Sequence, residues 1–476
     1  MLKHVKGKIV YITLILVGVL LIYFLFYMIF SYNVAHTNGS ESKEKINSNI
    51  VEKSKYEGVG VATNIEEEKM FRSAIHYPVF ESNIINSEIM RYLNETKERF
   101  KKSLEVGDKQ LSSEQPANLS LSFRIYKVAD GLYSIVFSEE SYREETDVKL
   151  ASKIFIIDIN KEKFINPDEL FYDSNPQKED LYRVVRESLI ESKYKYSFLE
   201  RKWQDWVNKQ DLSNMYITEE SLVFRFNKYE LVIDNADTLE ISVPLQKVAE
   251  LLKEEWQEKL LVKEKEEETE PIKDNNIISE EEKKPVIEEK DSKKKRVALT
   301  FDDGPHPKNT MEVLNLLKSY NAKGTFFVLG SRVDFYPDIT KRIVEEGHEI
   351  GNHTWDHRDL TKLRPETIKQ EIEDTNTMVE KATGIKPALF RPPYGATNKA
   401  VTDLLNVPEI MWSVDTLDWK YRSPENILDI VKQNTKDGSI ILMHDIHSTS
   451  VQGLKLVLEY LDKEGYEFVT VTDLGK

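Results

Sequence analysis

The sequence predicts a C-terminal α/β domain, built as a distorted (β/α) barrel and preceded by an α+β domain and an N-terminal transmembrane helix. Three observations lead to this prediction. Short apolar strands alternate with helical stretches in residues 296–476, segments of residues 71–261 alternate between apolar and polar side chains, and residues 9–30 form an almost wholly apolar run. These patterns are typical of parallel βα units, of half-buried strands and of a membrane span, respectively.

Composition restricts the partners and sites that the chain can have. Its 476 residues suffice for two or three domains, on a prior of roughly 150 residues per domain. The formal net charge of -16 argues against nucleic-acid binding, because proteins that track phosphates need clustered Lys and Arg. The sequence contains no cysteine, which excludes disulfides and thiolate metal sites. Any metal ion must therefore be held by histidine and carboxylate side chains.

Residues 9–30 are predicted to be a transmembrane helix, because a helix of this length covers a hydrocarbon core roughly 30 Å thick. Lys3, Lys6 and Lys8 precede it, so the positive-inside rule keeps residues 1–8 in the cytoplasm and places the rest of the chain outside. The alternative is a cleaved signal peptide, but the apolar run exceeds the usual core of about 7–15 residues and ends in aromatic side chains. We therefore expect a single-pass protein of the cell membrane.

One folded region is predicted between the membrane helix and the last domain. Residues 31–70 are rich in Ser, Asn, Glu and Lys without sustained apolar periodicity, which predicts a flexible stalk. Residues 71–261 are predicted to form an α+β extracytoplasmic domain with helices against a mostly antiparallel sheet. The candidate strands are Leu119–Ile125, Leu132–Phe137, Ile154–Ile159 and Leu222–Phe226, and the candidate helices are Ile84–Phe100, Lys178–Ser192 and Val248–Leu260.

Residues 262–295 are predicted to be a charged linker. They mix charges of both signs, and Pro271 and Pro285 interrupt any helix. A coil of this length spans about 30 Å. We therefore expect the two folded regions to move independently.

The last domain, residues 296–476, alternates strands with helices, which predicts parallel strands closed or nearly closed into a barrel. In such folds the chemistry gathers at the carboxyl ends of the strands, and polar side chains follow the candidate strands at these ends. The candidate strands are Val297–Phe301, Gly324–Val328, Glu349–Gly351, Ala388–Phe390, Ile410–Trp412, Ile440–Met443 and Phe468–Val471.

Two aspartates and two histidines at these strand ends indicate a metal site. Asp302 and Asp303 are adjacent carboxylates, which repel each other unless a cation or a proton relieves the charge. His353 and His357 are four residues apart, so both can face one ion. Alone, the histidine pair fits surface or core histidines better, but together with the carboxylates it favours a divalent ion with open coordination positions. Two nitrogens and one oxygen suit zinc.

Two further strand ends offer groups for acid–base chemistry. Arg391 supplies a cation that can orient a carboxylate, and the rigid turn Arg391-Pro-Pro-Tyr-Gly395 carries backbone N–H groups that can face an oxyanion. His444 lies across the predicted barrel mouth and can protonate a leaving amine.

These residues resemble the polysaccharide deacetylases of the NodB-homology type, carbohydrate esterase family four, and most of all the peptidoglycan N-acetylglucosamine deacetylases of Gram-positive bacteria. All five motifs of that family occur in order, and the resemblance covers nearly all of residues 296–476. They are Thr300-Phe-Asp-Asp-Gly304, His353-Thr-Trp-Asp-His357, Arg391-Pro-Pro-Tyr-Gly395, Asp415-Thr-Leu-Asp-Trp419 and Ile441-Leu-Met-His444. The resemblance implies a metal-dependent N-deacetylase that releases acetate and leaves a free amino sugar.

The resemblance also implies a role for each motif residue. Asp302 acts as the general base and is oriented by Arg391. His444 acts as the general acid and pairs with Asp418, and the backbone N–H of Tyr394 contributes to the oxyanion hole. The implied metal ligands are Asp303, His353 and His357, with Zn²⁺ as the expected ion and Co²⁺ or Mn²⁺ as alternatives, and the implied substrate pocket includes Trp419 and Pro392.

Some polar and aromatic residues of this domain also fit a structural role. Trp419 fits a plain core residue about as well as a pocket wall, and Asp415 fits a structural cap better than a catalytic group. His306, His348 and His447 are expected to be mostly structural or rim residues.

An enzyme anchored on a tether suits a cell-wall glycan as substrate. N-acetylglucosamine of peptidoglycan is the first expectation and N-acetylmuramic acid the alternative, while chitin-type oligosaccharides and acetylated xylan are the family's other substrates. Deacetylation of the wall is expected to confer resistance to lysozyme. A protein of another class, a non-catalytic wall-binding or signal-sensing protein, is disfavoured because every catalytic residue of the motifs is present.

The role and any ligand of residues 71–261 stay open. This region weakly resembles uncharacterised extracytoplasmic modules that precede such deacetylases and also occur in anti-sigma sensors. The stretches Ile75-His-Tyr-Pro78 and Phe164-Ile-Asn-Pro-Asp-Glu-Leu170 carry that likeness.

Overall fold

The computed structural model describes residues 54–68, 70–105, 116–142, 148–172, 175–192, 194, 198–227, 230–231, 238–261 and 294–475. Residues 51–476 form one compact unit. The predicted transmembrane helix at 9–30, residues 1–8 and nearly all of the predicted linker at 262–295 lie outside the described residues. Among the helices that are described, none is both long and apolar enough to cross a membrane.

The first part of the described chain is built around a six-stranded sheet in the order β1-β2-β3-β4-β5-β6. Neighbouring strands are antiparallel except β2 and β3, which are parallel, so the predicted mostly antiparallel sheet is confirmed. Helix α2 packs on it through buried side chains spaced three or four residues apart, from Ile85 to Phe100. The elements are β1 (Val59–Glu67), β2 (Phe71–Phe80), α2 (Asn83–Glu105), β3 (Ala117–Ala129), β4 (Leu132–Tyr142), β5 (Val148–Asp158) and β6 (Lys163–Ile165).

Strand β1 lies within residues 31–70, so the prediction of a flexible stalk is wrong for the last part of that segment. The strand pairs with β2 along its whole length, from Val59 opposite Phe80 to Glu67 opposite Arg72. Its apolar alternation is weak, and the partner strand is what satisfies its backbone N–H and C=O groups.

A second sheet, antiparallel and three-stranded, has the order β7-β8-β9. The surrounding helices share one apolar cluster with it, in which Trp203 and Trp206 are buried. The elements are η1 (Pro167–Leu170), α3 (Asn175–Glu191), α4 (Glu200–Lys209), β7 (Met215–Ile217), β8 (Ser221–Phe226), β9 (Leu239–Pro244), η2 (Leu245–Leu251) and α5 (Glu254–Leu261).

The single helix predicted at Val248–Leu260 is wrong, because the chain breaks between η2 and α5. Leu252 has an extended backbone there and forms an antiparallel bridge with Phe171. This contact with a distant segment outweighs the local helical periodicity.

From β10 onward the chain forms a parallel sheet flanked by helices, which confirms the α/β class. The strands run in the order β12-β11-β10-β14-β13, β15 also pairs with β10, and every pair is parallel. The central strand β10 is buried on both faces, as is typical of parallel sheets. The strands are β10 (Lys295–Asp302), β11 (Gly324–Val328), β12 (Glu349–Asn352), β13 (Val414–Asp415), β14 (Ser439–His444) and β15 (Tyr466–Phe468).

The predicted strands Ala388–Phe390 and Ile410–Trp412 are wrong as ladder strands. Phe390 forms only isolated parallel bridges, with Asn352 and with Glu409. Prolines flank these segments and cannot donate to a ladder, which limits the pairing to single bridges. A continuous closed barrel of strands is accordingly not found in the part of the chain that the structure describes.

The last predicted strand, Phe468–Val471, is displaced in the structure. Strand β15 ends at Phe468, and Val471 begins the short helix α14. The side chain of Thr470 accepts a hydrogen bond from the N–H of Asp473, and such a cap favours a helix over a strand.

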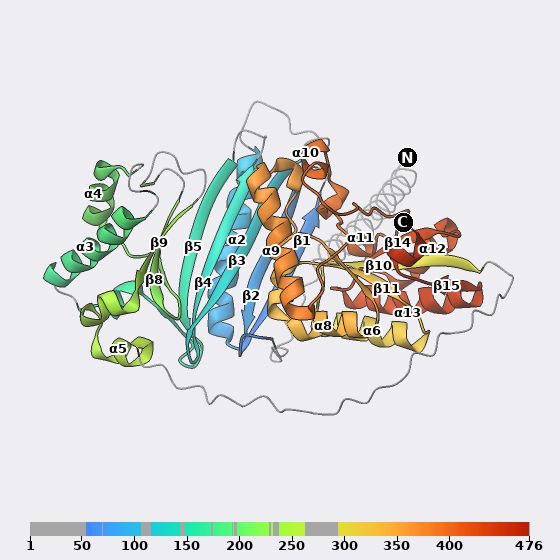
Figure 1. Cartoon of the computed structure of the whole chain (residues 1–476), viewed down its shortest axis with the longest axis horizontal. Helices are drawn as coiled ribbons and strands as arrows, with labels where there is room; N and C mark the ends of the chain where they lie inside the picture. Colours follow the sequence, from blue (N-terminus) through green and yellow to red (C-terminus); the bar gives the residue numbers. More distant parts are fainter. Residues whose placement is uncertain are drawn as a thin grey trace, which may run out of the picture. The chain divides into compact units, whose positions relative to one another are not determined.

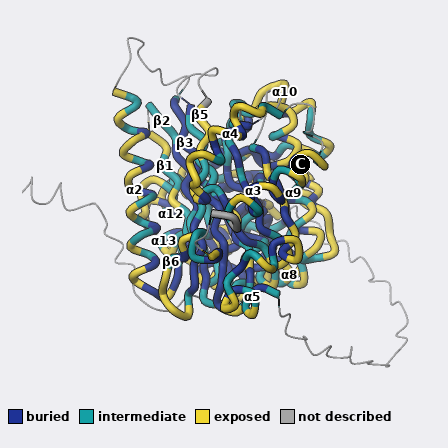
Figure 2. The backbone as a smooth tube through the Cα atoms, turned by 90° about the vertical axis from the view of Figure 1, so that its left-hand side faces the viewer, coloured by how far each residue is buried: buried dark blue, intermediate teal, exposed yellow. Residues whose placement is uncertain are grey.

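Helices cover the parallel sheet, and Figure 1 shows α6, α8 and α13 along it. Helix α13 packs against both α6 and α12. In Figure 2 the helices alternate between buried and exposed faces, while the strands are mostly buried. The helices are α6 (Asn309–Ser319), α7 (Gly330–Phe335), α8 (Pro337–Glu345), η3 (Leu360–Lys362), α9 (Pro365–Thr383), η4 (Pro393–Gly395), α10 (Lys399–Thr402), α11 (Asp418–Tyr421), α12 (Pro424–Asn434), α13 (Ser448–Lys463) and α14 (Val471–Leu474).

The two folded regions share an apolar cluster within the compact unit. Phe335 and Tyr336, at the end of α7, join the core formed by α2 and the six-stranded sheet. The ring centroid of Phe335 lies 5.0 Å from that of Tyr56 and 5.7 Å from that of Phe123. The structure thus differs from the prediction of two independently moving regions, because large aromatic side chains are buried between them.

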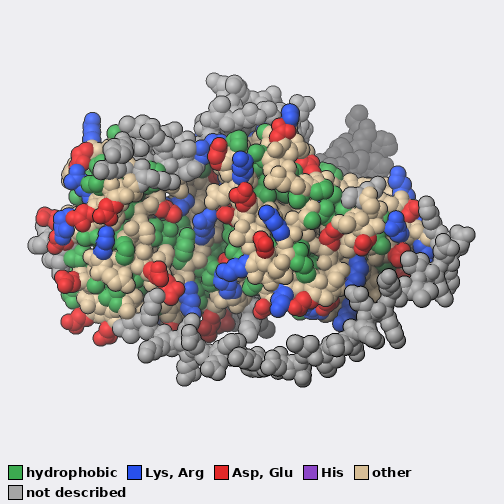
Figure 3. Space-filling model, viewed as in Figure 1, with side chains coloured by type: hydrophobic (Ala, Val, Ile, Leu, Met, Phe, Trp, Pro, Cys, Tyr) green, Lys and Arg blue, Asp and Glu red, His purple; other side chains and the backbone are tan. Residues whose placement is uncertain are grey.

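Charged side chains of both signs are interspersed on the face drawn in Figure 3.

Candidate active site

The predicted catalytic residues meet at the carboxyl ends of the parallel strands. Asp302 is the last residue of β10 and is in register with His444, the last residue of β14. His353 directly follows β12, and Arg391 donates its backbone N–H to Asn352, the last residue of that strand. The parallel register therefore confirms that these side chains gather at one edge of the sheet.

Asp303, His353 and His357 form a buried cluster in which one donor atom of each lies within 4.8 Å of the others. The Oδ1 atom of Asp303 lies 3.5 Å from Nε2 of His353 and 3.4 Å from Nε2 of His357. Ligand atoms bound tetrahedrally to zinc at about 2.0–2.2 Å are roughly 3.3–3.6 Å apart, so the spacing suits one ion. This buried oxygen accepts no hydrogen bond from the described residues, which is costly unless a cation binds it.

Both imidazoles of the cluster are suited to present Nε2 to a metal ion. The Nδ1 atom of His353 lies 2.7 Å from the carbonyl oxygen of Arg391, which accepts its proton and leaves the lone pair on Nε2. Burial lowers the pKa of His357 to about 3, so this imidazole is neutral, as a metal ligand must be.

Asp302 is held in place by a fully buried arginine. Nη1 of Arg391 donates to Oδ1 of Asp302 at 2.7 Å and to the hydroxyl of Thr300 at 2.8 Å, and its Nε donates to the carbonyl oxygen of Ile410 at 3.0 Å. The guanidinium also lies 4.0 Å from the ring centroid of Phe327. These contacts fix the carboxylate of Asp302 beside the cluster of Asp303, His353 and His357, called below the metal-type cluster. A fixed position of this kind is what a general base requires.

His444 forms a tight pair with a buried carboxylate. Its Nδ1 lies 2.7 Å from Oδ1 of Asp418, and its backbone N–H donates to Oδ2 at 2.8 Å. The hydroxyl of Ser450 donates to the same Oδ2 at 2.6 Å. Burial by itself would lower the pKa of His444, but the charge and hydrogen bond of Asp418 and the nearby carboxylates raise it to about 10. His444 is therefore protonated at neutral pH, the state that a general acid needs.

Tyr394 lies in a tight turn beside the metal-type cluster. Its backbone is in the left-handed region, with φ 59° and ψ 8°, and its ring centroid lies 4.5 Å from that of His357. Within the described residues, no backbone carbonyl accepts a hydrogen bond from its N–H. The turn thus carries an unused backbone donor, which is what an oxyanion hole requires.

The loop that carries His357 is strained and is held from several sides. Thr354 has φ 71° and His357 has φ 61°, and a non-glycine residue in this region costs roughly 1–3 kcal/mol. The first two N–H groups of α7 donate to the carbonyl oxygens of Thr354 and Trp355, both at 3.0 Å. The carboxylate of Glu371, in α9, accepts the N–H of Trp355 at 3.1 Å. The conformation of the loop therefore depends on its tertiary contacts.

The remaining motif residues have structural contacts. Asp415 accepts the N–H of Leu417 at 2.8 Å, in keeping with the structural cap expected of it. Trp419 is half-buried and its side chain hydrogen-bonds to Asp415, while Pro392 is buried before the turn of Tyr394. Their place in an acetyl pocket stays a prediction.

Two of the other histidines are structural, as expected. Nδ1 of His306 accepts the N–H groups of Lys308 and Asn309 at 3.2 and 3.1 Å, and Nδ1 of His348 accepts the N–H of Gly324 at 3.1 Å. The ring centroid of His447 lies 6.4 Å from that of His444.

The pairing of His444 with Asp418 predicts a pH effect. Because Asp418 raises the pKa of His444, Asp418→Asn is expected to move the basic limb of the kcat/KM profile down by about 1–3 pH units. His444 must be protonated to act, so activity falls as pH rises through its pKa, and the variant loses activity at a lower pH than the wild type.

The matched control for this variant is Ser450→Ala. It removes one hydrogen bond to Asp418 but leaves the charge, and should shift the limb far less. A basic limb at the same pH in Asp418→Asn and wild type would contradict the pairing.

Sequence reasoning missed several residues that hold the site in place. Ser450 fixes Asp418, and Glu371 fixes the loop of His357, but both lie on helices whose polar residues look like ordinary surface positions. His76 was noticed only as part of Ile75-His-Tyr-Pro78. No pattern in the sequence links it to the distant metal-type cluster that it approaches.

Known proteins are similar to this chain, one of them over nearly its whole length. A polysaccharide deacetylase family model matches residues 289–408. The chain is 31% identical over 448 residues to the peptidoglycan-N-acetylmuramic acid deacetylase PdaC of Bacillus subtilis, which covers 92% of this chain and 92% of that protein. It is 49% identical over 180 residues to the peptidoglycan-N-acetylglucosamine deacetylase PgdA of Listeria monocytogenes, 38% of this chain and 39% of that protein. A peptidoglycan-N-acetylglucosamine deacetylase of Bacillus cereus is 41% identical over 188 residues, 38% of this chain and 88% of that protein.

At one edge of the α/β sheet, Arg391 fixes Asp302 and Asp418 fixes His444, an arrangement suited to acid–base hydrolysis. The similarity to PdaC extends over nearly the whole of both chains. This chain belongs to the polysaccharide deacetylase family, and it is a hydrolytic N-deacetylase.

Proposed function

We propose that the protein is a membrane-anchored, metal-dependent enzyme that removes N-acetyl groups from the amino sugars of peptidoglycan. N-acetylglucosamine is the first choice of sugar, and the observation that carries it is the 49% identity to an N-acetylglucosamine deacetylase over 180 residues. N-acetylmuramic acid is the second candidate, because the relative that matches 92% of the chain acts on that sugar.

The chain's own residues supply a base, an oxyanion donor and an acid. Asp302, held at 2.7 Å by Arg391, takes the proton of the attacking water. The N–H of Tyr394 donates to the oxygen of the tetrahedral intermediate. His444, kept protonated by Asp418, gives its proton to the departing nitrogen. The products are acetate and a free amine on the sugar.

Asp303, His353 and His357 would hold the divalent ion. When bound there, the ion would polarise the acetyl carbonyl and acidify water. The unpartnered Oδ1 atom of Asp303 and the two Nε2 atoms beside it support this assignment. Two nitrogens and one oxygen suit Zn²⁺, and Co²⁺ or Mn²⁺ can use the same donors.

Residues 9–30 would anchor the enzyme and keep its site on the wall side of the cell membrane. The apolar length of this segment and the three lysines before it support this orientation. An anchored deacetylase acts on glycan strands next to the membrane.

The test of this function is the acetylation of the wall. Cells that lack the protein are expected to have more acetylated glycan strands, measured by mass spectrometry of wall fragments. They should also lyse faster in lysozyme, because their glycan strands keep the N-acetyl groups that a muramidase hydrogen-bonds. On a deacetylated sugar the muramidase loses that hydrogen bond, which leaves its own polar group unpaired, and it meets a cation. One such lost contact costs about 1–3 kcal/mol, which is roughly 5- to 150-fold in affinity.

The controls identify the enzyme and the sugar. Wild-type protein should restore deacetylation and His444→Ala should not. Fragment masses distinguish free amines on glucosamine from free amines on muramic acid. Unchanged wall acetylation in cells without the protein, together with no release of acetate from wall fragments by the purified enzyme, would point to a chitin-type or xylan substrate instead.

A further inference from the structure

Side chains of the six-stranded sheet contact the loop that carries His357, residues 353–359, here called the metal loop. They contact it on both sides of His357. The contacting residues of the sheet lie about 220 to 290 positions earlier in the chain, in the part whose role the family relationship leaves open. The three contacts are His76 Nε2 to the carbonyl oxygen of Asp356 at 2.9 Å, an ion pair of Glu140 with Arg358, and Arg72 Nη1 to Oδ2 of Asp359 at 3.2 Å. The strained backbone at His357 is therefore flanked by residues that are held from the sheet.

A chain of hydrogen bonds sets the donor and acceptor roles of His76. Nη2 of Arg332, in α7, donates to the hydroxyl oxygen of Thr63 at 2.6 Å. That hydroxyl lies 2.9 Å from Nδ1 of His76. It donates to Nδ1, because the carbonyl oxygen of Asp356 only accepts and so requires the proton of the neutral ring on Nε2. His76 Nε2 then carries the proton and donates to the carbonyl oxygen of Asp356. Burial lowers the pKa of His76 to about 4, which keeps the ring in this neutral form.

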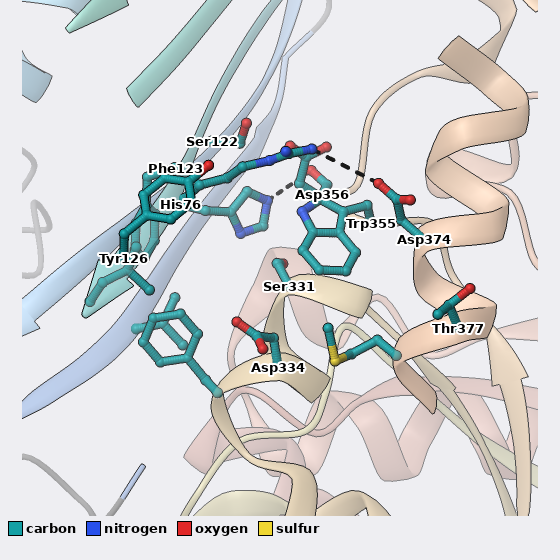
Figure 4. A pocket seen from close by; sticks show the side chains of 15 residues that line it. His76, Ser122, Phe123, Tyr126, Ser331, Asp334, Trp355, Asp356, Asp374 and Thr377 are labelled. Carbon is teal, nitrogen blue, oxygen red and sulfur yellow. Dashed lines mark hydrogen bonds and ion pairs between the residues drawn. The ribbon is translucent and has the colours of Figure 1, made fainter. Parts of the chain in front are cut away.

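A cavity of about 300 Å³ lies beside these hydrogen bonds, so the loop depends more on them for its position than a fully packed loop would. His76, Ser331, Trp355 and Asp356 line it, and Figure 4 shows His76 reaching across to Asp356. Close packing is what usually immobilises a buried loop, and it is incomplete here. Two hydrogen bonds therefore restrain the residue before His357: the one from His76 to the carbonyl oxygen of Asp356, and the one from the N–H of Asp356 to Glu371 at 3.3 Å.

We propose that His76 is a positioning residue for the metal site: by holding the carbonyl of Asp356 it fixes the backbone from which the imidazole of His357 is presented. In this way the six-stranded sheet is part of the scaffold of the active site. The inference rests on the proposed metal centre and assigns a role to residues outside the deacetylase motifs.

The test measures metal binding by the full chain without any substrate. His76→Ala is expected to weaken Zn²⁺ binding about tenfold, in competition with a chromophoric chelator. Loss of a direct outer contact to a ligand lowers affinity by roughly 10–100-fold, and His76 acts one residue away from His357, so the low end of that range applies. The visible absorption spectrum of the Co²⁺-loaded variant should also change. His76→Gln, whose amide can donate to the same carbonyl, should restore most of the affinity. On wall fragments, kcat should fall while KM stays near that of the wild type.

The matched control is Asn86→Ala, in α2, whose side chain binds Phe80 at the end of β2. Asn86 accepts the N–H of Phe80 at 2.9 Å and donates to its carbonyl oxygen at 2.6 Å, so its loss weakens the same strand away from the metal loop. This variant should lower the thermal unfolding temperature without changing Zn²⁺ affinity or the Co²⁺ spectrum. Wild-type metal affinity in His76→Ala, or an equal loss in Asn86→Ala, would overturn the inference. A wild-type chain that binds no metal would instead refute the proposed metal centre.

Discussion

Removal of the divalent ion is expected to lower turnover by roughly a thousandfold or more, since the charge stabilisation that such an ion supplies amounts to several kcal/mol. Asp303, His353 and His357 offer two imidazole nitrogens and one carboxylate oxygen, with the nitrogens 3.5 and 3.4 Å from that oxygen. The measurement is the rate of acetate release after dialysis against a chelator, with metal content followed by elemental analysis. Zn²⁺ should restore the rate, and Co²⁺ or Mn²⁺ should substitute for it.

Magnesium is the control for this experiment. Mg²⁺ prefers six oxygen ligands in octahedral geometry, so it should not replace an ion held by two imidazoles. Undiminished turnover in a sample shown to be metal-free would refute a metal-dependent reaction.

Asp302→Asn is expected to lose about 10²–10⁴ in kcat and to keep its metal ion, because general-base catalysis contributes that much. The asparagine keeps the shape of the side chain and can still accept the hydrogen bond that Arg391 donates at 2.7 Å. It cannot take a proton from water. His353→Ala should lose both the metal ion and the activity, because it removes one of the three ligand side chains.

Metal content and kcat, measured on the same preparations, separate the two roles. Asp302 is close to the cluster, with Oδ2 3.8 Å from Nε2 of His353, so a role as ligand is the real competitor. If Asp302→Asn lost its metal ion along with His353→Ala, Asp302 would be a ligand. If it retained near-normal turnover, another group would be the base.

The elements predicted well from sequence are those in which the residues of the element itself, by their apolar pattern, already indicate a buried strand. Strand β11 covers Gly324–Val328 as predicted, because five small or apolar residues in a row leave no exposed face for a helix. The first strand of the parallel sheet, predicted at Val297–Phe301, is also found and is longer, at Lys295–Asp302. Asp302 and His444 were placed correctly at strand ends because parallel strands bring their carboxyl ends to one edge.

The elements predicted poorly depend on a partner distant in the chain. Strand β1 exists through its pairing with β2, and the helix break at Leu252 exists through its bridge to Phe171. Phe390 has single bridges in place of a ladder. Local periodicity contains no information about these partners, so it favoured a stalk, a longer helix and two strands.

The sequence by itself predicted the groups proposed for the chemistry, because a base, an acid and metal ligands must be particular residue types at the ends of particular strands. It determined the polysaccharide deacetylase family for the same reason. Only the tertiary structure decided how those groups are held: Arg391 on Asp302, Asp418 on His444, and His76 beside the metal loop. The orientation of a side chain is set by neighbours that fold against it from elsewhere in the chain, and no spacing along the sequence records them.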